Sequence, residues 1–512
     1  MNKIKIFSLA LLLGVTVACD DFLDQHPSDS LLAEQGMQTL NDCQEVSVGI
    51  YSAFKNSALY SGSLTLLPDL QTDLVQAVQG YSNVYGEVYR WDLQPNSSEV
   101  EAVFSGLYLI INRCNYFMKY KDRVYEKLVS DSDKLTFNRR LADVYFARAL
   151  AYSELIKTFC EAYDPQSADN QLGVSINLEY APDKDLVIKR SSLKASYEQV
   201  LADLAQSEKL MTRVAGVNES AGRQYFSVGV VSALKARVYL YMEEYKLAVD
   251  YASRVIDATQ SYALCDAYTT QTNAATGTLT TEYGYMWQYD RGNEIIWKIA
   301  MSNTDRGGAL GKIFQGYNTS AYYPDYVPAS WVLDLYSNYD GRYNTFFKQV
   351  KTGYTHGLEW PLLMKYPGNP EIDNGGERLF TNMPKPFRLA EQYLIRAEAY
   401  YNLGNESMAQ QDLTTLRKSR IAGYGSTGAS GNALLQEIQE ERVRELCMEG
   451  FRLADLKRWK KGFARVPQLF TVGGAKNNAL KVNASDKLFT WPIPKHEIEA
   501  GNGVVEGNMS NN

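Results

Sequence analysis

The chain has 512 residues, of which 45% are hydrophobic and 22% are charged, and its formal net charge is −7. This length and balance are those of a globular protein with one large domain or several smaller ones. An acidic chain without a basic run argues against nucleic-acid binding and against electrostatic docking to anionic lipid.

Residues 1–18 have the pattern of a secretory signal peptide. Lys3 and Lys5 precede an apolar run of about a dozen residues, whereas a membrane-spanning helix needs roughly 20. The run ends in Thr16-Val17-Ala18-Cys19, which resembles a bacterial lipoprotein signal, in which the Cys thiol is lipidated and becomes the mature N-terminus. Ordinary cleavage, with Cys19 unmodified, is the alternative. Cleavage after residue 18 would remove both lysines and no acid, and leave a net charge of −9.

The segment that follows, residues 19–45, is predicted to be a lipidated N-terminus and a tether. Its acidic and turn-forming residues, among them Asp20, Asp21 and the His26-Pro27 pair, argue against regular structure.

A short motif then occurs three times. It reads R-A-L-A-Y at 148–152, K-A-R-V-Y at 235–239 and R-A-E-A-Y at 396–400, each within a helix-period apolar pattern. Small residues at these positions let two antiparallel helices approach closely, as in tetratricopeptide (TPR) repeats. We therefore predict a mainly α, TPR-like helix–turn–helix superhelical scaffold. The copies are 87 and 161 residues apart, so the scaffold must carry large insertions.

Further helices are expected near residues 104–120 and 191–210. The regions 258–330 and 338–386 are rich in Thr, Gly, Asn, Tyr or Pro, and are predicted to be loop-rich. We expect an N-terminal repeat-containing half over residues 46–257. The second half, residues 258–512, would combine the insertions with the last repeat, and the two halves would pack as one unit.

Cysteine and histidine usage argues against metal sites and disulfides. Besides Cys19 there are five cysteines, an odd number at wide spacing and without a C-x-x-C pair, so buried free thiols are expected. The three histidines are far apart. No cofactor and no metal site is predicted.

Three carboxylates on one predicted helix, Glu441, Glu445 and Glu449, are the strongest candidates for acid–base chemistry. Paired carboxylates serve glycosidases, but those pairs usually converge across a cleft. Arginines interleave with these acids in the sequence. We therefore favour helix-surface ion pairs together with a fold-specific network, and expect loss of Glu445 to cost stability before binding.

Aromatic residues outside the repeats are the best candidates for ligand contact. Tyrosine, which occurs 37 times, offers an apolar ring face and a polar hydroxyl, and both suit a sugar. Local packing of irregular loops is the alternative for each group. Three groups stand out: Tyr81, Tyr85, Tyr89 and Trp91; Tyr283, Tyr285, Trp287 and Tyr289; and Tyr317, Tyr322, Tyr323 and Tyr326. Polar side chains nearby that suit sugar hydroxyls are Asp73, Asn83, Arg90, Asn318 and Asp325.

Four segments, spread over nearly the whole chain, resemble the SusD/RagB family of Bacteroidetes surface lipoproteins. "CDDFLDQHPSDSL" (19–31) is similar to the family's mature N-terminus, and "FRLAEQYLIRAEAYYNLGN" (387–405) to one of its helices. "IQEERVRELCMEGFRLADLKRW" (438–459) and "LFTWPIPKHEIEAGNG" (488–503) resemble its most specific motifs, in the right order.

The resemblance implies a binding protein and not an enzyme. Family members lie on the outer face of the outer membrane, held by their lipid anchor, and cap a SusC-like TonB-dependent transporter. Their ligand is most often an oligosaccharide, and some bind peptides. Ligand-binding loops would lie near the first and third aromatic groups. A secreted hydrolase and a purely structural TPR adaptor remain as alternatives.

Overall fold

The structure is a computed structural model that describes residues 36–182, 187–211, 221–272, 277, 279–318, 320–373, 378–474 and 479–512. The predicted signal peptide and Cys19 lie outside these residues. Helices dominate the described part, and its strands form small two- and three-stranded sheets. The mainly α fold class with loop-rich insertions is confirmed.

The first helices of the described chain include two, α2 and α6, that begin at side-chain caps. The helices in this part are α2 (Leu40–Ala53), α3 (Ser63–Leu70), α4 (Gly86–Tyr89), α5 (Ser98–Tyr125), α6 (Asp131–Phe159) and α7 (Leu193–Met211). Thr39 and Asp42 form a reciprocal capping box at α2, and the Ser130 side chain accepts from the Asp133 amide at α6. Helix α2 thus begins within residues 19–45, which corrects the predicted end of the tether. The helices expected near 104–120 and 191–210 are present as α5 and α7.

The three motif copies form three helix pairs. They are α6 with α7, α8 (Val228–Tyr241) with α9 (Tyr245–Ile256), and α14 (Leu389–Asn402) with α15 (Glu406–Lys418). The motif alanines Ala149, Ala236 and Ala397 are fully buried, as are Ala248 and Ala409 on the partner helices. Close helix approach at small residues is the reason for the motif, and the TPR-like prediction is confirmed.

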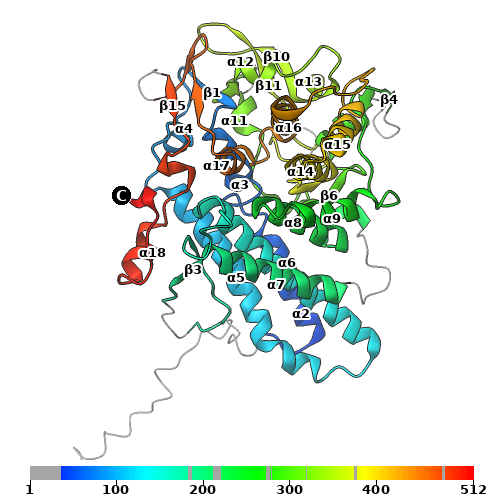
Figure 1. Ribbon diagram of the computed structural model, residues 1–512, viewed down its shortest axis with the longest axis vertical. Helices are drawn as coiled ribbons and strands as arrows, with labels where there is room; N and C mark the ends of the chain where they lie inside the picture. Colours follow the sequence, from blue (N-terminus) through cyan, green and yellow to red (C-terminus); the bar gives the residue numbers. More distant parts are fainter. Residues whose placement is uncertain are drawn as a thin grey trace, which may run out of the picture.

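The last two repeats are neighbours in space although 161 residues separate their motifs in the sequence. Ala236 and Ala248 share one apolar cluster with Ile395 and Ala399 of α14. Figure 1 shows α14 and α15 above α8 and α9, with α2, α5, α6 and α7 at the lower end of the molecule. The chain between the two repeats therefore leaves the scaffold and returns to it.

The insertions and the C-terminal segment carry short elements around this scaffold. The remaining helices are α10 (Glu282–Tyr289), α11 (Lys312–Gln315), α12 (Ser330–Leu333), α13 (Gly341–Phe346), α16 (Gly431–Leu446), α17 (Arg452–Arg458) and α18 (Lys495–Ala500). Short 3-10 turns span Ala221–Arg223, Lys487–Phe489 and Met509–Asn511.

The strands pair mostly as short antiparallel ladders. The pairs are β2 (Leu172–Ser175) with β3 (Arg190–Ser192), β4 (Thr270–Thr272) with β5 (Leu279–Thr281), β6 (Ile295–Trp297) with β12 (Phe387–Arg388), β7 (Tyr317–Asn318) with β8 (Ala321–Tyr322), β10 (Phe347–Lys351) with β11 (Glu359–Leu363), and β13 (Phe463–Arg465) with β15 (Leu480–Val482). The remaining sheet has the order β14 (Thr471–Val472), β1 (Val75–Val78), β9 (Tyr326–Pro328).

The three candidate carboxylates lie in a buried ion network, not on a helix surface, which corrects that part of the prediction. Glu445 is fully buried and binds Arg420 (Nε–Oε2 2.9 Å), Arg388 (Nη1–Oε1 2.9 Å) and Arg342 (Nη1–Oε2 3.0 Å). Burial alone would raise the pKa of the Glu445 carboxyl, but these three guanidinium charges hold it well below its ordinary value.

The neighbouring carboxylates, Glu441 and Glu449, are also paired with positively charged side chains. Glu441 binds Arg342 (2.6 Å) and Arg417 (2.8 Å), and Glu449 binds Arg388 and Lys365 (2.6 Å each). Arg342 comes from α13, Arg388 from β12 and Glu445 from α16, so the network joins the insertions to the last repeat. The part of the prediction that placed these acids in a fold-specific network is confirmed.

The described residues include five of the six cysteines and the helices that can be compared with a membrane span. Cys43, Cys114, Cys160, Cys265 and Cys447 are buried free thiols, as predicted. Among the described helices, none is both long enough and apolar enough to cross a bilayer.

Candidate ligand-binding face

The fold brings the first and third aromatic groups together. Strands β1 and β9 pair antiparallel, with Ala77 opposite Tyr326. Beyond the strand, the Ser82 amide donates to Asp325 Oδ1 (2.7 Å), and the Tyr326 hydroxyl donates to the Val84 carbonyl (2.5 Å). Two loops that are about 240 residues apart in sequence are thereby locked side by side.

Tyr81 carries an organised polar edge in the first loop. Its hydroxyl donates to Asn83 Oδ1 (3.0 Å) and accepts from Arg90 Nη1 (3.0 Å). Asn83 is exposed, and Tyr81 is partly buried with its ring 5.7 Å from that of Tyr326. A ring face and three polar groups thus lie within one hydrogen-bond network at the surface.

The β7–β8 hairpin presents a second aromatic pair. The rings of Tyr317 and Tyr322 lie 4.9 Å apart in an edge arrangement, and both are partly exposed. The Arg378 guanidinium lies 4.1 Å from the Tyr317 ring centre and donates to the Tyr322 hydroxyl (2.5 Å). Cation–π contact and this hydrogen bond together fix the orientation of the two rings.

A row of rings that the sequence analysis missed extends this surface. Tyr354 contacts the Tyr323 ring (5.4 Å) and stacks on His356 (5.3 Å), which stacks in turn on Phe470 (4.8 Å). Burial lowers the pKa of His356, so the imidazole is neutral near pH 7 and packs as an aromatic ring. The only local signal was a tyrosine and a histidine between the glycines of "GYTHG" (353–357).

We call this surface the aromatic face. Its rings are Tyr81, Tyr85, Tyr317, Tyr322, Tyr323, Tyr354, His356 and Phe470, and its polar side chains are Asn83, Arg90, Asn318, Asp325 and Arg378. Aromatic planes combined with amide, carboxylate and guanidinium groups allow ring stacking and directed hydrogen bonds to one ligand.

Three residues predicted in the first and third groups are packing residues instead. Tyr89 and Tyr326 are fully buried, so their ring faces cannot meet a ligand from solvent. Trp91 donates its indole N–H to Asp486 (2.9 Å) and packs edge-on against Phe463 and Phe489. We remove them from the candidate site.

Asp73 and the second aromatic group also lie elsewhere. Asp73 is buried and bound to Arg452 (2.9 Å). Tyr283 and Trp287 on α10 are almost fully buried, and the Tyr283 hydroxyl donates to Glu445 (2.9 Å). Tyr289 is buried and stacks on Tyr285 (4.8 Å). None of these residues belongs to the aromatic face.

The described residues contain no group of three or more His, Cys, Asp or Glu side chains that could hold a metal ion. Their acidic side chains in the candidate carboxylate cluster are all engaged by arginine or lysine. The aromatic face is therefore the strongest candidate for a functional site that these residues offer.

Known proteins are similar to this chain over most of its length. One family model, described as "SusD family", matches residues 359–510, and another, "Starch-binding associating with outer membrane", matches residues 21–240. SusD-like protein P25 of Formosa agariphila is 22% identical over 547 residues, covering 97% of this chain and 96% of its own. Starch-binding protein SusD of Bacteroides thetaiotaomicron is 24% identical over 458 residues, covering 79% and 77%.

Solved structures share the fold. A SusD superfamily protein from Bacteroides thetaiotaomicron has a TM-score of 0.76 at 22% identity, covering 92% of this chain and 99% of its own. A putative sugar binding protein from Bacteroides vulgatus has a TM-score of 0.75 at 23% identity, covering 93% and 99%.

Fold and site together define a class of protein, namely an α-helical repeat scaffold whose insertions present an aromatic surface. The two family models lie in separate parts of the chain, and the curated relatives extend across both. The family models and the curated relatives support assignment of the chain to the SusD family.

Proposed function

We propose that the protein binds an oligosaccharide at the cell surface through the aromatic face and delivers it to a SusC-like TonB-dependent transporter. The observation that carries the proposal is the aromatic face itself, where loops from three regions of the chain place partly exposed rings beside polar groups. The description of the model matching residues 21–240 and the name of the Bacteroides thetaiotaomicron relative support a carbohydrate ligand and an outer-membrane location.

The chemistry of the face suits a sugar. A pyranose ring has apolar C–H faces and a rim of hydroxyls, so it needs flat apolar partners and directional polar ones. Tyr322 and Tyr81 offer both from one side chain, since the ring is partly exposed and the hydroxyl lies in a hydrogen-bond network. Stacking would set the plane of the sugar, and Asn83 and Arg90 would select hydroxyl geometry.

Peptide binding is the alternative ligand class, and Arg378 is the residue that favours it. The guanidinium is exposed, and no carboxylate of the described chain forms an ion pair with it. A peptide carboxylate would bind there through charge-assisted hydrogen bonds, which a neutral sugar would not need.

A hydrolase loses its best candidate residues. Glu441, Glu445 and Glu449 are each fixed by two or more cations in the core, and these charges keep them ionised although burial alone would raise their pKa. A general acid needs a raised pKa and access to the scissile bond, and these carboxylates have neither.

Attachment and partner complete the proposal. Lipidation of Cys19 would tether the chain to the outer membrane, with several acyl chains on one residue giving a stable anchor. The acidic segment after Cys19 would connect this anchor to the folded part of the protein beside its transporter. Incorporation of radiolabelled fatty acid, lost in Cys19→Ala, tests the anchor, and no incorporation into the unsubstituted chain would refute it.

The ligand class is tested by isothermal titration of residues 20–512 against a panel of neutral oligosaccharides and a panel of peptides. We expect saturable binding of at least one oligosaccharide and weaker binding by Tyr322→Ala. Saturable peptide binding with no oligosaccharide response would replace the glycan by a peptide. Release of product from a polysaccharide by the unsubstituted chain would instead indicate a hydrolase.

A further inference from the structure

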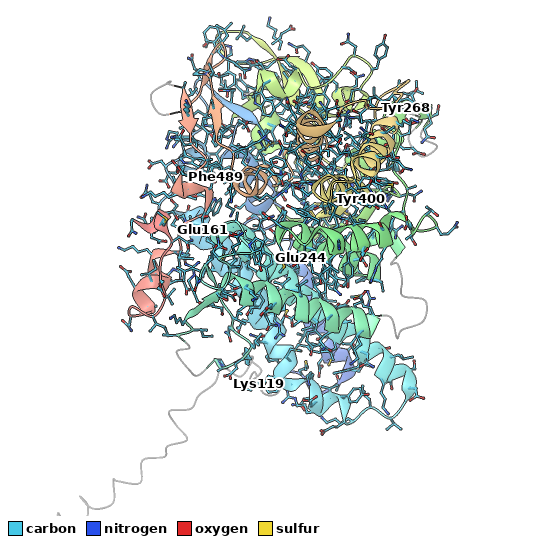
Figure 2. All side chains as sticks on the ribbon, in the orientation of Figure 1. Lys119, Glu161, Glu244, Tyr268, Tyr400 and Phe489 are labelled. Carbon is cyan, nitrogen blue, oxygen red and sulfur yellow. The ribbon has the colours of Figure 1, made fainter. Side chains whose placement is uncertain are left out.

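A second hollow lies away from the aromatic face, between α10, the β4–β5 hairpin and α13. Its volume is about 590 Å³, within the range of small-ligand sites. In Figure 1, β4 lies on the opposite side of the upper part of the molecule from β1, and Figure 2 shows Tyr268 at that edge. We call this hollow the α10 cavity.

The mouth of the α10 cavity is aromatic and polar. Tyr268 and Tyr339 are exposed at it, Tyr339 to 71%. The amides of Gln288, Asn338 and Asn344 also line it, and within the described chain none of the three side chains forms a hydrogen bond. Free amide donors and acceptors beside exposed rings form a surface with unused hydrogen-bonding capacity.

One tryptophan that lines the cavity has an indole N–H without a partner in the described structure. Trp287 lines the cavity and is 1% exposed, and its Nε1 atom is buried without a hydrogen-bond partner in the described structure. Five of the seven tryptophans, by contrast, donate this hydrogen to a defined acceptor, as Trp91 does to Asp486 and Trp331 does to the Asp73 carbonyl. A buried donor left unsatisfied costs free energy, so this part of the cavity wall is not stabilised by its own hydrogen bonds.

Charge narrows the class of ligand. Asp340 is the one ionisable acid or base among the lining residues apart from the two tyrosines, and Arg342 binds it at 2.7 Å from the core side. The other polar lining groups are amides, hydroxyls and the indole. A charged ligand would find no counter-charge here, whereas a neutral polyhydroxylated one would find both donors and acceptors.

We propose that the α10 cavity is a second binding site for a neutral sugar of one or two rings. Tyr268 and Tyr339 would stack against the ring at the mouth, and Asn338, Asn344 and Gln288 would bind its hydroxyls. The Trp287 ring, which lines the cavity, would report a bound sugar through its indole N–H signal. The proposal stands on the cavity alone and holds whether or not the aromatic face binds oligosaccharide.

The test uses residues 20–512 with ¹⁵N-labelled tryptophan and follows the seven indole N–H signals by NMR. Loss of a signal in Trp287→Phe assigns the one of interest. The probes are glucose, galactose, mannose, xylose, maltose and cellobiose, with glycerol as the control polyol. We expect at least one sugar to shift the Trp287 signal saturably, and the double variant Asn338→Ala, Tyr339→Ala to raise Kd at least tenfold.

Both exposed side chains can be replaced without disturbing the core, so an unchanged melting temperature will show that the double variant is folded. Tyr322→Ala on the aromatic face should leave the Trp287 response intact, which separates the two sites. The proposal is overturned if no sugar shifts the signal up to its solubility limit. It is also overturned if glycerol shifts the signal equally, or if the double variant binds like the unsubstituted chain.

Discussion

The buried ion network around Glu445 and the aromatic face are both dense in functional-looking side chains, but they use them in opposite ways. In the network, Glu445 and Arg342 are fully buried and saturated by partners. On the aromatic face, Tyr322 and Asn83 keep one side toward solvent. Saturated groups hold the fold together, and partly exposed ones are available to a ligand.

This difference separates the roles of two sequence features, the E-R-x-x-E-L-x-x-E-G motif and the tyrosine-rich loops. The E-R-x-x-E-L-x-x-E-G motif lies in the core and joins α16 to the insertions. Its glycine, Gly450, adopts φ +83°, and a Cβ there would lie 2.3 Å from the Leu64 carbonyl oxygen. The motif therefore stabilises the fold, whereas the proposed binding surface lies on loops outside it.

The largest expected effect is loss of the central acid of the network. Glu445→Gln leaves Arg342, Arg388 and Arg420 without a shared counter-charge in the core, so we expect a loss of about 3–5 kcal/mol of unfolding free energy. Urea denaturation measures it. The matched control is Glu440→Gln, at a partly exposed position one residue before Glu441, which should cost less than about 1 kcal/mol. Equal losses in the two variants would refute a special role for the network.

Lowering the pH should decrease the unfolding free energy that the Glu445 network contributes. The folded-state pKa values of Glu441, Glu445 and Glu449 lie below their ordinary value of 4.5, because arginine and lysine charges outweigh the effect of burial. Their stabilisation is therefore complete above about pH 4.5 and is lost as the pH falls through the lowered values. Unfolding free energies measured from pH 7 to pH 3 should show this fall, and Glu445→Gln should flatten it. A Glu445→Gln curve parallel to that of the unsubstituted chain would contradict the assignment.

The repeat interface should tolerate no added bulk. Ala397 is fully buried between α14, α15 and α16, so Ala397→Leu should cost about 1–3 kcal/mol through overpacking. Thermal unfolding measures the change. Gln411→Leu, which places the same side chain on the exposed side of α15, is the control and should leave the melting temperature nearly unchanged. A stable Ala397→Leu variant would mean that the helices are not in close contact there.

Substitutions on the aromatic face should weaken ligand binding and leave stability nearly unchanged, the opposite of those in the core. Tyr322→Ala removes a partly exposed ring, so it should weaken oligosaccharide binding about tenfold, or roughly 1.4 kcal/mol, with little change in stability. Tyr125→Ala, at an exposed tyrosine near the end of α5, is the control and should bind normally. Titration calorimetry measures both, and equal affinities of the two variants would remove Tyr322 from the site.

Arg378→Gln should have the smallest effect. It deletes the cation over the Tyr317 ring and the hydrogen bond to the Tyr322 hydroxyl, so it loosens the pair without removing either ring. We expect a loss of about 0.5–1 kcal/mol in binding of a neutral oligosaccharide. A much larger loss, confined to ligands that carry a carboxylate, would favour the peptide alternative.

The scaffold was predictable because its signal is local and repeated. Each motif alanine predicts a close helix contact without information from the rest of the chain. Ala149, Ala236 and Ala397 are all buried in the structure. The identity of the Glu445 partners was not predictable, because Arg342 and Arg388 come from elements whose positions depend on the insertions.

The candidate site was predictable only in part. The tyrosine-rich loops stood out, but their pairing across about 240 residues follows from the β1–β9 ladder, which is too short to leave a sequence pattern. Which face of a ring points inward was also hidden, so Tyr89 and Trp287 seemed equivalent to Tyr81 in sequence. His356 was missed because a single histidine in a glycine-containing turn carries no periodic signal.

Binding at the aromatic face is tested most directly by hydroxyl-radical footprinting of tyrosines, with and without a bound oligosaccharide. Mass spectrometry then reports the protection of each ring separately. Ligand binding is expected to protect Tyr81, Tyr322 and Tyr323 and to leave Tyr125 unchanged. If a saturating oligosaccharide protects none of these three rings, the aromatic face is not the binding site. Protection only at Tyr268 and Tyr339 would contradict the account in the same way.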